Sequence, residues 1–575
     1  SSLTLGIFTN KTFGLTMTIQ EKQHNLIEEF ENFNDWEDRY SHIISMGKKL
    51  NPFPKEYKTD KNKIEPASYQ LPDVSGTMDI SSTAERGSMD IYSLAGSEPG
   101  SNVNYKAAPD NINTRFGKLE FPGGFPTEAT VQKVYDELDL QRATQLYLDM
   151  YPALSMHGML KGNVRDYGVK NSSYVGVTAN RLDSKGMYLT GNTESIYAFI
   201  VLDLKKDGPT VVKVPKGVMG PIDDHNFLFL ADVGPTGKDK GLGGKYLILP
   251  PGYEGDIPEG YFVQQSKTYN AFSFLRANTA IVGEGEKAMK FIRENLEVYP
   301  LSTGPTEGTY TNVSGVDMNS LVPEDASAFT WMHEIINYEP AEAFGKELLG
   351  RLESIGIQKG KDFNPDARMV NIMNQAALEA VAMSRVIAFN NRDENGKVYA
   401  DREWESPYIT NNSTFYENDY IDIEARHVFH FTADGITPAM AARMPDGLGS
   451  RYQTTYKDKN GDFLDGNKTY KLHMLPNVPA AMFWSVTVYD SYSRCEIKTS
   501  QPFPSVSSQK VPAPVTNDDG SVDIYFSNEL PEGVAEQNWV QTLPNQGFFV
   551  YIRYYGPTKE FHEKTWIPND VELVN

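Results

Sequence analysis

Apolar residues recur along the chain with two different periods, which divide it into helical and strand-rich stretches. Residues 17–50 place Leu26, Phe30 and other apolar side chains at helical spacing, and this pattern predicts a helical hairpin. Residues 66–112 carry Pro, Ser, Gly, Asp and Asn with little apolar periodicity. We therefore predict a linker or wrapping arm there.

The next stretch changes from one period to the other. A long helix is predicted in TEATVQKVYDELDLQRATQLYLDMYPALSMHGML, with Thr127 or Thr130 as its cap and an interruption at Pro152. Residues 174–275 then alternate apolar and polar side chains in segments such as SIYAFIVLDL, TVVKVPK and KYLILPP. Because no long helix separates these segments, we expect an antiparallel sheet.

The remainder repeats this change. Residues 276–390 return to helical spacing in EKAMKFIRENLEVYPL and NIMNQAALEAVAMSRVIAFNN. Residues 426–575 are predicted to be strand-rich, with MFWSVTVYD, VDIYF and FFVYIRYYG separated by turn sequences such as NDDGS.

Length and composition limit the class of protein. A chain of 575 residues is too long for one core, and three or four domains are expected. The net charge of −22, without a dense Lys/Arg cluster, argues against binding to nucleic acid. No apolar run is long enough for a transmembrane helix, and the first residues, SSLTLGIFTNKTFGLTM, are too polar for a secretion signal.

Few catalytic signatures are present. The single cysteine, Cys495, excludes an internal disulfide and a Cys-based zinc site, and we expect a quiet, partly buried thiol. The glycine-rich stretches do not form a phosphate loop, and no G-x-S-x-G elbow occurs. His333-Glu334 lacks the second histidine of a zinc helix, and Asp458–Asp462 favours a polar turn over a calcium loop. We predict no metal and no cofactor.

One polar cluster adjoins a very apolar strand. Asn192, Thr193, Glu194 and Tyr197 lie just before or inside SIYAFIVLDL. Polar groups in that position either line a pocket or bind the adjoining backbone. The residues alone favour the second role and leave the first open.

A second cluster lies in EARHVFHF. Arg426 and His430 share a face whether the segment is a helix or a strand, whereas His427 points away in a strand. A histidine in such surroundings is more often a satisfied core residue than a base. Trp and Arg side chains of the last 100 residues suit either a ligand groove or a sandwich core; they are Trp484, Trp539, Arg553 and Trp566.

Two family resemblances follow from these motifs. LIEEFENFNDWEDRYSHIISMGKKL followed by EYKTDKNKIE resembles the start of SufE-type sulfur acceptors, but Glu65 is followed by Pro-Ala-Ser and not by the cysteine motif. Sulfur transfer needs a thiolate, so that chemistry is not expected here. The stretch from about residue 115 to the end resembles the domains of unknown function 1254 (DUF1254) and 1214 (DUF1214), through TGNTESIYAFIVLDLKKDGPTVVKVP, AMFWSVTVYD and FFVYIRYYGP.

The second resemblance implies a mixed, mainly β protein with an immunoglobulin-like β-sandwich, a helical middle and a C-terminal jelly roll. It also implies an exported bacterial protein, periplasmic or secreted. Together with the periodicity it gives these expected divisions: leader 1–16, partial SufE-like helical segment 17–65, linker or arm 66–112, β-sandwich with leading helix 113–275, helical region 276–415 and jelly roll 416–575.

Two functions remain open at this point. The first is binding of a polar or sugar-like small molecule in a cleft between the two sandwiches, with Asn192, Thr193, Tyr197, His430 and Trp484 as ligand-binding candidates. The alternative is a hydrolase of an extracellular polar or carbohydrate substrate. In that case Glu194, Arg426 and His427 would supply acid–base and oxyanion roles. A homo-oligomer is compatible with either function.

Overall fold

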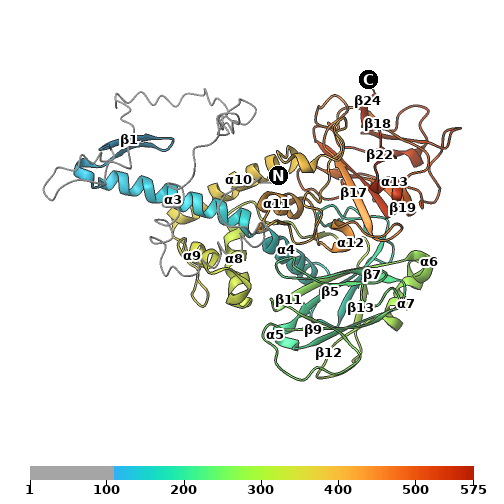
Figure 1. The fold of residues 1–575 in the computed structure, drawn as a ribbon, viewed down its shortest axis with the longest axis horizontal. Helices are drawn as coiled ribbons and strands as arrows, with labels where there is room; N and C mark the ends of the chain where they lie inside the picture. Colours follow the sequence, from blue (N-terminus) through green and yellow to red (C-terminus); the bar gives the residue numbers. More distant parts are fainter. Residues whose placement is uncertain (1–108, 575) are drawn as a thin grey trace, which may run out of the picture. The chain divides into compact units, whose positions relative to one another are not determined.

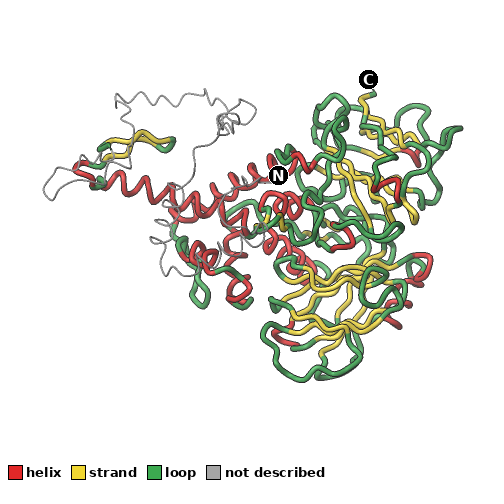
Figure 2. Tube along the Cα trace, in the orientation of Figure 1, coloured by secondary structure: helices red, strands yellow, loops and turns green. Residues whose placement is uncertain are grey.

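The computed structural model describes residues 109–574, in which helices and strands are both well represented (Figure 2). The predicted leader, the predicted helical hairpin and the linker up to residue 108 lie outside the described residues. The end of the predicted linker is a strand, because β1 (Asn111–Thr114) pairs antiparallel with β2 (Gly117–Glu120). Every helix between residues 109 and 574 is too short or too polar to span a lipid bilayer.

The first half of the described chain contains a six-stranded sheet and a four-stranded sheet. Their strand orders are β13-β3-β5-β11-β7-β8 and β10-β9-β6-β12. The first sheet consists of β3 (Tyr174–Val177), β5 (Ile196–Asp203), β7 (Val218–Asp224), β8 (Phe229–Val233), β11 (Asn270–Ala277) and β13 (Thr309–Asn312). The second consists of β6 (Thr210–Val214), β9 (Gly244–Leu249), β10 (Phe262–Gln265) and β12 (Glu297–Pro300).

These strands form where apolar residues alternate or run together, as predicted. Ile196, Ala198, Ile200 and Leu202 of β5 are fully buried in a core that also holds Ile248 of β9. Pairing is antiparallel, as expected, except between β9 and β10 and between β3 and β13. Phe199 and the neighbouring aromatic residues lie in a different apolar cluster, which also contains residues of helix α4 (Tyr151–Arg165). The six-stranded sheet therefore contributes to two cores.

Most of the long helices pack together around a core of their own, whereas α7 (Glu286–Asn295) packs into the core of the first two sheets (Figure 1). Thr127 caps α3 as predicted by accepting a hydrogen bond from the Thr130 amide, and α4 begins at the predicted interruption near Pro152. Helix α10 packs against α3 and α11. The main helices besides α4 are α3 (Glu128–Asp149), α7 (Glu286–Asn295), α8 (Ser327–Tyr338), α9 (Lys346–Glu353), α10 (Ala367–Phe389) and α11 (Ile423–Thr432).

Helix α11 corrects the prediction that strands begin at residue 426. The Asp422 side chain accepts a hydrogen bond from the Ala425 amide and so caps the start of the helix. The aromatic and β-branched residues of EARHVFHF favour strands in isolation, but here they pack against neighbouring helices. Tertiary packing has overridden local preference.

The last part of the chain contains two four-stranded sheets with orders β17-β23-β19-β20 and β22-β21-β18-β24. Both contribute to one apolar core that includes Val486, Ile524 and Ile552. The strands are β17 (Ser450–Thr455), β18 (Tyr470–Met474), β19 (Ala480–Asp490), β20 (Ser505–Ser507), β21 (Val522–Ser527), β22 (Trp539–Gln541), β23 (Phe548–Pro557) and β24 (Glu572–Leu573).

Short elements connect these layers. They are β4 (Gly186–Met187), β14 (Met318–Asn319), β15 (Tyr416–Glu417), β16 (Tyr420–Ile421), α5 (Leu204–Asp207), α6 (Thr279–Val282), α12 (Pro438–Ala441), α13 (Lys559–His562) and four 3₁₀ turns at Pro122–Gly124, Ala341–Ala343, Glu394–Gly396 and Glu536–Asn538.

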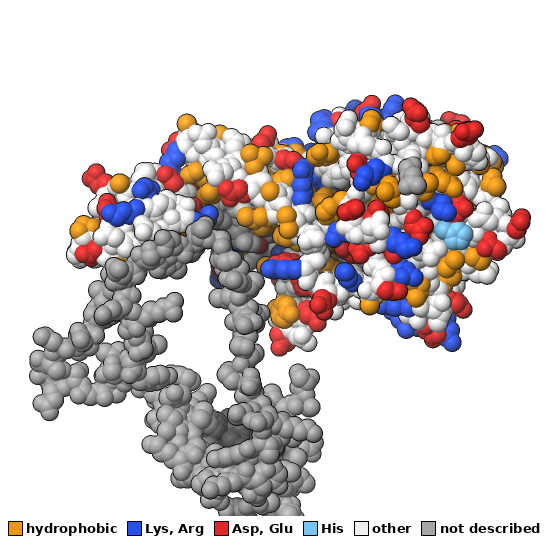
Figure 3. Space-filling view, turned by 90° about the horizontal axis from the view of Figure 1, so that it is seen from above, with side chains coloured by type: hydrophobic (Ala, Val, Ile, Leu, Met, Phe, Trp, Pro, Cys, Tyr) orange, Lys and Arg blue, Asp and Glu red, His pale blue; other side chains and the backbone are white. Residues whose placement is uncertain are grey.

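On the face drawn in Figure 3, acidic and basic side chains are mixed, and apolar side chains lie between them. Exposed apolar residues of the helices include Leu378, Met383 and Val386.

Candidate functional site

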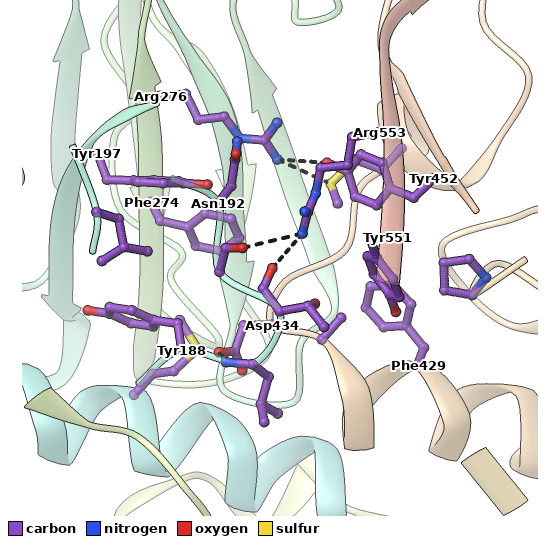
Figure 4. Close-up of a pocket in the computed structure, with 18 of the residues that line it drawn as sticks. Tyr188, Asn192, Tyr197, Phe274, Arg276, Phe429, Asp434, Tyr452, Tyr551 and Arg553 are labelled. Carbon is purple, nitrogen blue, oxygen red and sulfur yellow. Dashed lines mark hydrogen bonds between the residues drawn. The ribbon is translucent and has the colours of Figure 1, made fainter. Parts of the chain in front are cut away.

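A cavity lies where the six-stranded sheet meets the sheet of β17 and β23. Two arginines enter its wall from these two sheets (Figure 4). Each arginine is paired across strands with a tyrosine that also lines the cavity: Arg276 of β11 with Tyr197 of β5, and Arg553 of β23 with Tyr452 of β17. The register of two separate sheets thus places two arginine–tyrosine pairs around one space.

Arg276 is held lightly. Its Nη2 donates to the Tyr452 hydroxyl at 3.2 Å and lies 3.9 Å from the Met440 sulfur. Its Nε is buried and has no hydrogen-bond partner among residues 109–574. A buried donor without a partner is costly, and this one belongs to a side chain that lines the cavity.

Arg553 is held firmly. It is 2% exposed. Its Nη2 donates to the Thr190 carbonyl at 2.6 Å, and its Nη1 donates to the Tyr489 hydroxyl. The guanidinium carbon lies 4.9 Å from the centre of the Tyr452 ring, a cation–π arrangement. Thr190 has φ of +41°, which is unusual for a β-branched residue. This strained turn directs its carbonyl to the arginine.

The two arginines are not neutralised by salt bridges. Within the part of the chain that the structure describes, neither has a carboxylate oxygen within 4.0 Å. Burial raises the pKa of Tyr452, but the charges of Arg276 and Arg553 outweigh burial and hold it below its ordinary value. The lack of a neighbouring carboxylate and the lowered pKa of Tyr452 both indicate a positive potential in this space.

The nearby carboxyls do not cancel that potential fully. Asp434 lines the cavity, accepts hydrogen bonds from the Leu189 amide at 2.7 Å and the Ser155 hydroxyl at 3.1 Å, and has its pKa raised to about 7 by burial. Burial also raises the pKa of Glu496 well above its usual range, although Arg553 acts to lower it. Carboxyls whose pKa is raised by burial are less ionised than exposed ones, so they offset the charge of the two arginines only in part.

The enclosed space is small, about 50 Å³. That volume holds about four water molecules, or a compact group such as a carboxylate, and is well below the ~300 Å³ of ordinary ligand pockets. The remaining wall is aromatic and apolar, with Tyr188, Phe274 and Phe429 prominent in Figure 4. In this conformation the arrangement suits a small anion.

Two predicted ligand-binding residues lie at this cavity. Asn192 and Tyr197 both line it. The side-chain amide of Asn192 donates through Nδ2 to the Tyr555 hydroxyl at 2.7 Å, across the junction of the two sheets. Tyr197 is 6% exposed and stacks on Phe199. Residues from 192–197 therefore meet the C-terminal sheets at this junction.

Thr193 and Glu194 occupy the same junction but are bound within it. The Ser505 and Ser507 hydroxyls donate to the two Glu194 carboxylate oxygens at 2.6 and 2.7 Å, and Arg181 lies 3.6 Å from that carboxylate. Thr193 shares a hydrogen bond of 2.9 Å with Ser505. These contacts connect the two regions, and neither residue lines the cavity.

Arg426 and His430 lie elsewhere, at a separate cavity of about 320 Å³. Its lining shares no residue with the first cavity. Burial lowers the pKa of Arg426, and burial keeps the pKa of His430 well below its usual value. The second predicted cluster is therefore not brought together with Asn192 and Tyr197.

The other two candidates lie in packed regions. His427 bonds through Nε2 to the Ser384 hydroxyl at 2.7 Å and through Nδ1 to the Leu148 carbonyl at 3.3 Å, and burial lowers its pKa to about 4. Trp484 packs against the C-terminal core. Their proposed roles in catalysis and binding stay predictions.

The remaining sequence motifs have plain structural explanations. His333 contacts the Lys361 carbonyl at 2.7 Å, and the Asp458 side chain accepts the Asn460 amide at 2.8 Å in a turn. Cys495 is 1% exposed, and burial raises its pKa. Among residues 109–574, no group of three His, Cys, Asp or Glu side chains converges closely enough to hold a metal ion.

Of the two arginines of the cavity, Arg276 was missed at the sequence level, and Arg553 was named only as suiting either a ligand groove or a sandwich core, although a signal for both was present. Arg276 interrupts NAFSFLRA, and Arg553 interrupts FFVYIRYYG. A charged side chain inside an otherwise apolar strand must find a partner or a ligand. The tyrosine opposite each arginine follows only from the strand register.

Comparison with known proteins links this junction to two families. Residues 175–300 match DUF1254, and residues 449–559 match DUF1214, each described as a protein of unknown function. The first match includes Tyr197 and Arg276, and the second includes Tyr452 and Arg553. The two arginine–tyrosine pairs thus come from the two matched segments, one pair from each.

The N-terminal match is short. Residues 24–66 match SufE, described as an Fe-S metabolism associated domain. The cysteine desulfuration protein SufE of Wigglesworthia glossinidia brevipalpis is 40% identical over 43 residues, which are 8% of this chain and 30% of that protein. The match therefore spans about a third of its curated relative.

Two solved structures resemble the chain more distantly. A protein from Vibrio parahaemolyticus shares 15% identity with a TM-score of 0.45, over 76% of this chain and 100% of that one. An uncharacterised protein from Burkholderia cenocepacia shares 11% identity with a TM-score of 0.35, over 78% and 97%. The resemblances expected from the motifs are confirmed by the family matches: the chain carries a SufE-like segment, then a DUF1254-like segment, then a DUF1214-like segment.

Proposed function

We propose that the protein binds a small anionic ligand, a carboxylate or a group of similar size and charge, in the cavity between the DUF1254-like and DUF1214-like segments. The observation that carries this proposal is the pair of cross-strand arginine–tyrosine partners, Arg276 with Tyr197 and Arg553 with Tyr452. Guanidinium and phenol groups are the donors that carboxylates accept most strongly.

The small volume narrows the ligand class that the sequence suggested. A space of about 50 Å³ favours a compact anion over a sugar. The unpartnered Arg276 Nε and the unpartnered Tyr408 hydroxyl, both in side chains that line the cavity, supply donors without partners in residues 109–574. A bound anion would satisfy donors of this kind, which are costly when left alone.

The experiment is calorimetric titration of the wild type and Arg276→Met with formate and with acetate, using chloride as the reference anion. Arg276 is the better target, because Arg553 also holds the backbone of Thr190. A charge-assisted hydrogen bond contributes about 1.5–3 kcal/mol, so the affinity should fall at least about tenfold. Arg293→Met, the same change on the exposed face of α7, should leave the affinity unchanged.

Two results would overturn the proposal. One is equal affinity of the wild type and Arg276→Met for both carboxylates. The other is a wild type that does not distinguish formate and acetate from chloride. Circular dichroism of both variants checks that each is folded, and a thermal shift by the same anions gives an independent reading of binding.

A second candidate function rests on Tyr452. Its lowered pKa and its contact with Arg276 suit a proton donor or acceptor in an enzyme that acts on the bound anion. Tyr452→Phe separates the two functions. A binding protein should lose about fivefold in affinity with one hydrogen bond, whereas an enzyme should lose turnover while it retains most of its affinity.

We also propose that the six- and four-stranded sheets of the first half form an immunoglobulin-like sandwich, and that the two C-terminal sheets form a jelly roll. Each pair of sheets contributes to one apolar core, which supports this layout. An experimental structure with traced strand order would test it against the published layouts of those folds.

A further inference from the structure

A cavity much larger than the arginine site lies away from it, between helices α4 and α8 and strand β5. Its volume is about 720 Å³, which is within the range of pockets for drug-sized ligands. It shares no lining residue with the arginine cavity. Much of its wall is apolar, formed by Leu160, Val164, Val169, Val201 and Ile335.

Two histidines lie in the wall with their rings stacked. His157 of α4 and His225, which directly follows β7, have ring centres 5.5 Å apart and planes inclined by 11°. The edge of Trp331 contacts His157, with ring centres 5.3 Å apart. Packing on both sides fixes the orientation of the His157 ring.

A buried carboxylate orients His225. Glu339 is fully buried and lies 2.8 Å from the Nδ1 of His225. It also accepts hydrogen bonds from the Asn270 amide at 3.1 Å and the Asn270 side chain at 2.6 Å. Burial alone would raise the pKa of Glu339, but His225, the Tyr269 amide and the Asn270 side chain together lower it. The ionised carboxylate can only accept, so Nδ1–H of His225 donates to it, and Nε2 is the ring nitrogen left for a ligand.

His157 also contacts a carboxylate through one ring nitrogen, but through Nε2, whereas His225 does so through Nδ1. The Nε2 of His157 lies 2.9 Å from the Glu334 carboxylate, which also pairs with Lys161 at 2.6 Å. Burial lowers the pKa of His157 to about 4, so at neutral pH its Nε2 carries the proton and donates to Glu334. The Nδ1 of His157 then presents a lone pair.

Both of these remaining nitrogens lack a partner. The Nε2 of His225 and the Nδ1 of His157 are buried, and nothing within residues 109–574 donates to them or accepts from them. His225 is 1% exposed. Native structures rarely leave such groups alone, because a water molecule, an ion or a ligand usually satisfies them.

We propose that this cavity is a second ligand site, which takes an amphipathic molecule whose hydroxyl group donates to the free nitrogen of His225 or His157. The apolar wall would bury the body of the molecule. The charged lining residues, four basic and three acidic, do not favour a cationic ligand; they are Lys161, Arg165, Lys170, Lys206, Asp203, Asp207 and Glu334. A neutral hydroxyl is therefore preferred over an ammonium group.

The test uses two probes that differ only in the donor, 2-naphthol and 2-methoxynaphthalene, titrated calorimetrically into the full chain. One neutral hydrogen bond corresponds to about a fivefold preference for 2-naphthol in the wild type. His225→Phe keeps an aromatic ring but removes the acceptor, so the preference should vanish. His473→Phe removes another histidine that pairs with a carboxylate, Asp523, and should leave it intact.

A cavity-filling variant checks the place of binding and does not depend on His225→Phe folding. Val164 is half exposed at the cavity wall, so Val164→Trp should weaken binding of both probes at least about tenfold while the chain stays folded. Equal affinity of the two probes for the wild type would overturn the proposal. So would undiminished binding to Val164→Trp, or no binding of 2-naphthol up to its solubility limit. Arg276→Met should leave 2-naphthol binding unchanged, which separates this site from the anion site.

Discussion

The carboxyl of Asp434 should make stability fall as pH rises, and Asp434→Asn should remove that dependence. Asp434 accepts hydrogen bonds from the Leu189 amide and the Ser155 hydroxyl. Asparagine keeps the shape and can accept from the amide while its own NH₂ donates to the hydroxyl. The substitution therefore changes the charge with little change in packing.

The sign follows from the direction of the shift. Burial raises the pKa of Asp434 from its ordinary value of 3.8 to about 7. Between those values the folded state binds more protons than the unfolded state, so the free energy of unfolding falls as pH rises through this window. The full shift corresponds to about 4 kcal/mol, and the part between pH 5 and pH 8 to about 2.5 kcal/mol. The stabilising effect is complete below the unfolded pKa.

The measurement is denaturant unfolding of the wild type and Asp434→Asn at pH 5 and pH 8, in buffers without carboxylates, which would occupy the anion site. Relative to the wild type, the variant should gain about 2.5 kcal/mol between the two pH values. Other buried carboxyls with raised pKa, such as Glu405, contribute equally to both proteins and cancel. Asp518→Asn, on the exposed surface, should show no such gain. A difference between Asp434→Asn and wild type that is the same at both pH values would refute this account of Asp434.

Three further predictions concern packing and the segment junction. Gly158→Ala should destabilise the chain by more than about 2 kcal/mol, because the new Cβ would lie 2.0 Å from the Ser320 carbonyl oxygen. Gly350→Ala is also in a helix, but no atom lies within 4 Å of its new Cβ, so it should stabilise the chain by about 0.5–1 kcal/mol. Equal effects of the two substitutions in thermal unfolding would contradict the packing argument. Cys495→Ser should leave anion binding intact. The wild-type thiol of Cys495 should react slowly with a thiol reagent, because the thiol is buried and its pKa is raised. Rapid labelling would show that the thiol is accessible. Glu194→Gln should lower the free energy of unfolding by about 1–3 kcal/mol, because its carboxylate accepts from both Ser505 and Ser507, and an unchanged unfolding midpoint would mean that these contacts do not stabilise the junction.

Local pattern was enough for most of the strands and helices. Strand β5 forms where SIYAFIVLDL predicts it, and Thr127 caps α3 as expected. Helix α11 was missed, because its aromatic residues resemble a strand and the capping role of Asp422 is a weak local signal. Sheet pairing distant in sequence carries no comparable local signal.

The site shows the same limit more sharply. Asn192 and Tyr197 were identified because polar groups adjoin an apolar strand, a feature that is local. Arg276 meets Tyr197 only through the register of β5 with β11, and Arg553 meets Tyr452 only through the register of β17 with β23. A one-residue change in either register would send these side chains to opposite faces. The sequence could therefore suggest where the polar residues lie, but not which of them meet.

The hydrogen bonds across the junction imply that the DUF1254-like and DUF1214-like segments fold as one unit. Arg553 of the second segment donates to the carbonyl of Thr190 in the first, and Glu194 of the first accepts from two serines of the second. If the segments separated, Arg553 and Glu194 would each lose these partners, and a charged group that stayed buried without them would cost several kcal/mol. The cavity proposed to bind an anion lies at the same junction and is lined by Arg553, which also holds the Thr190 carbonyl. Ligand affinity and the stability of the junction are therefore coupled: an anion that bridges Arg276 and Arg553 would strengthen the junction, and variants that weaken the junction should weaken anion binding.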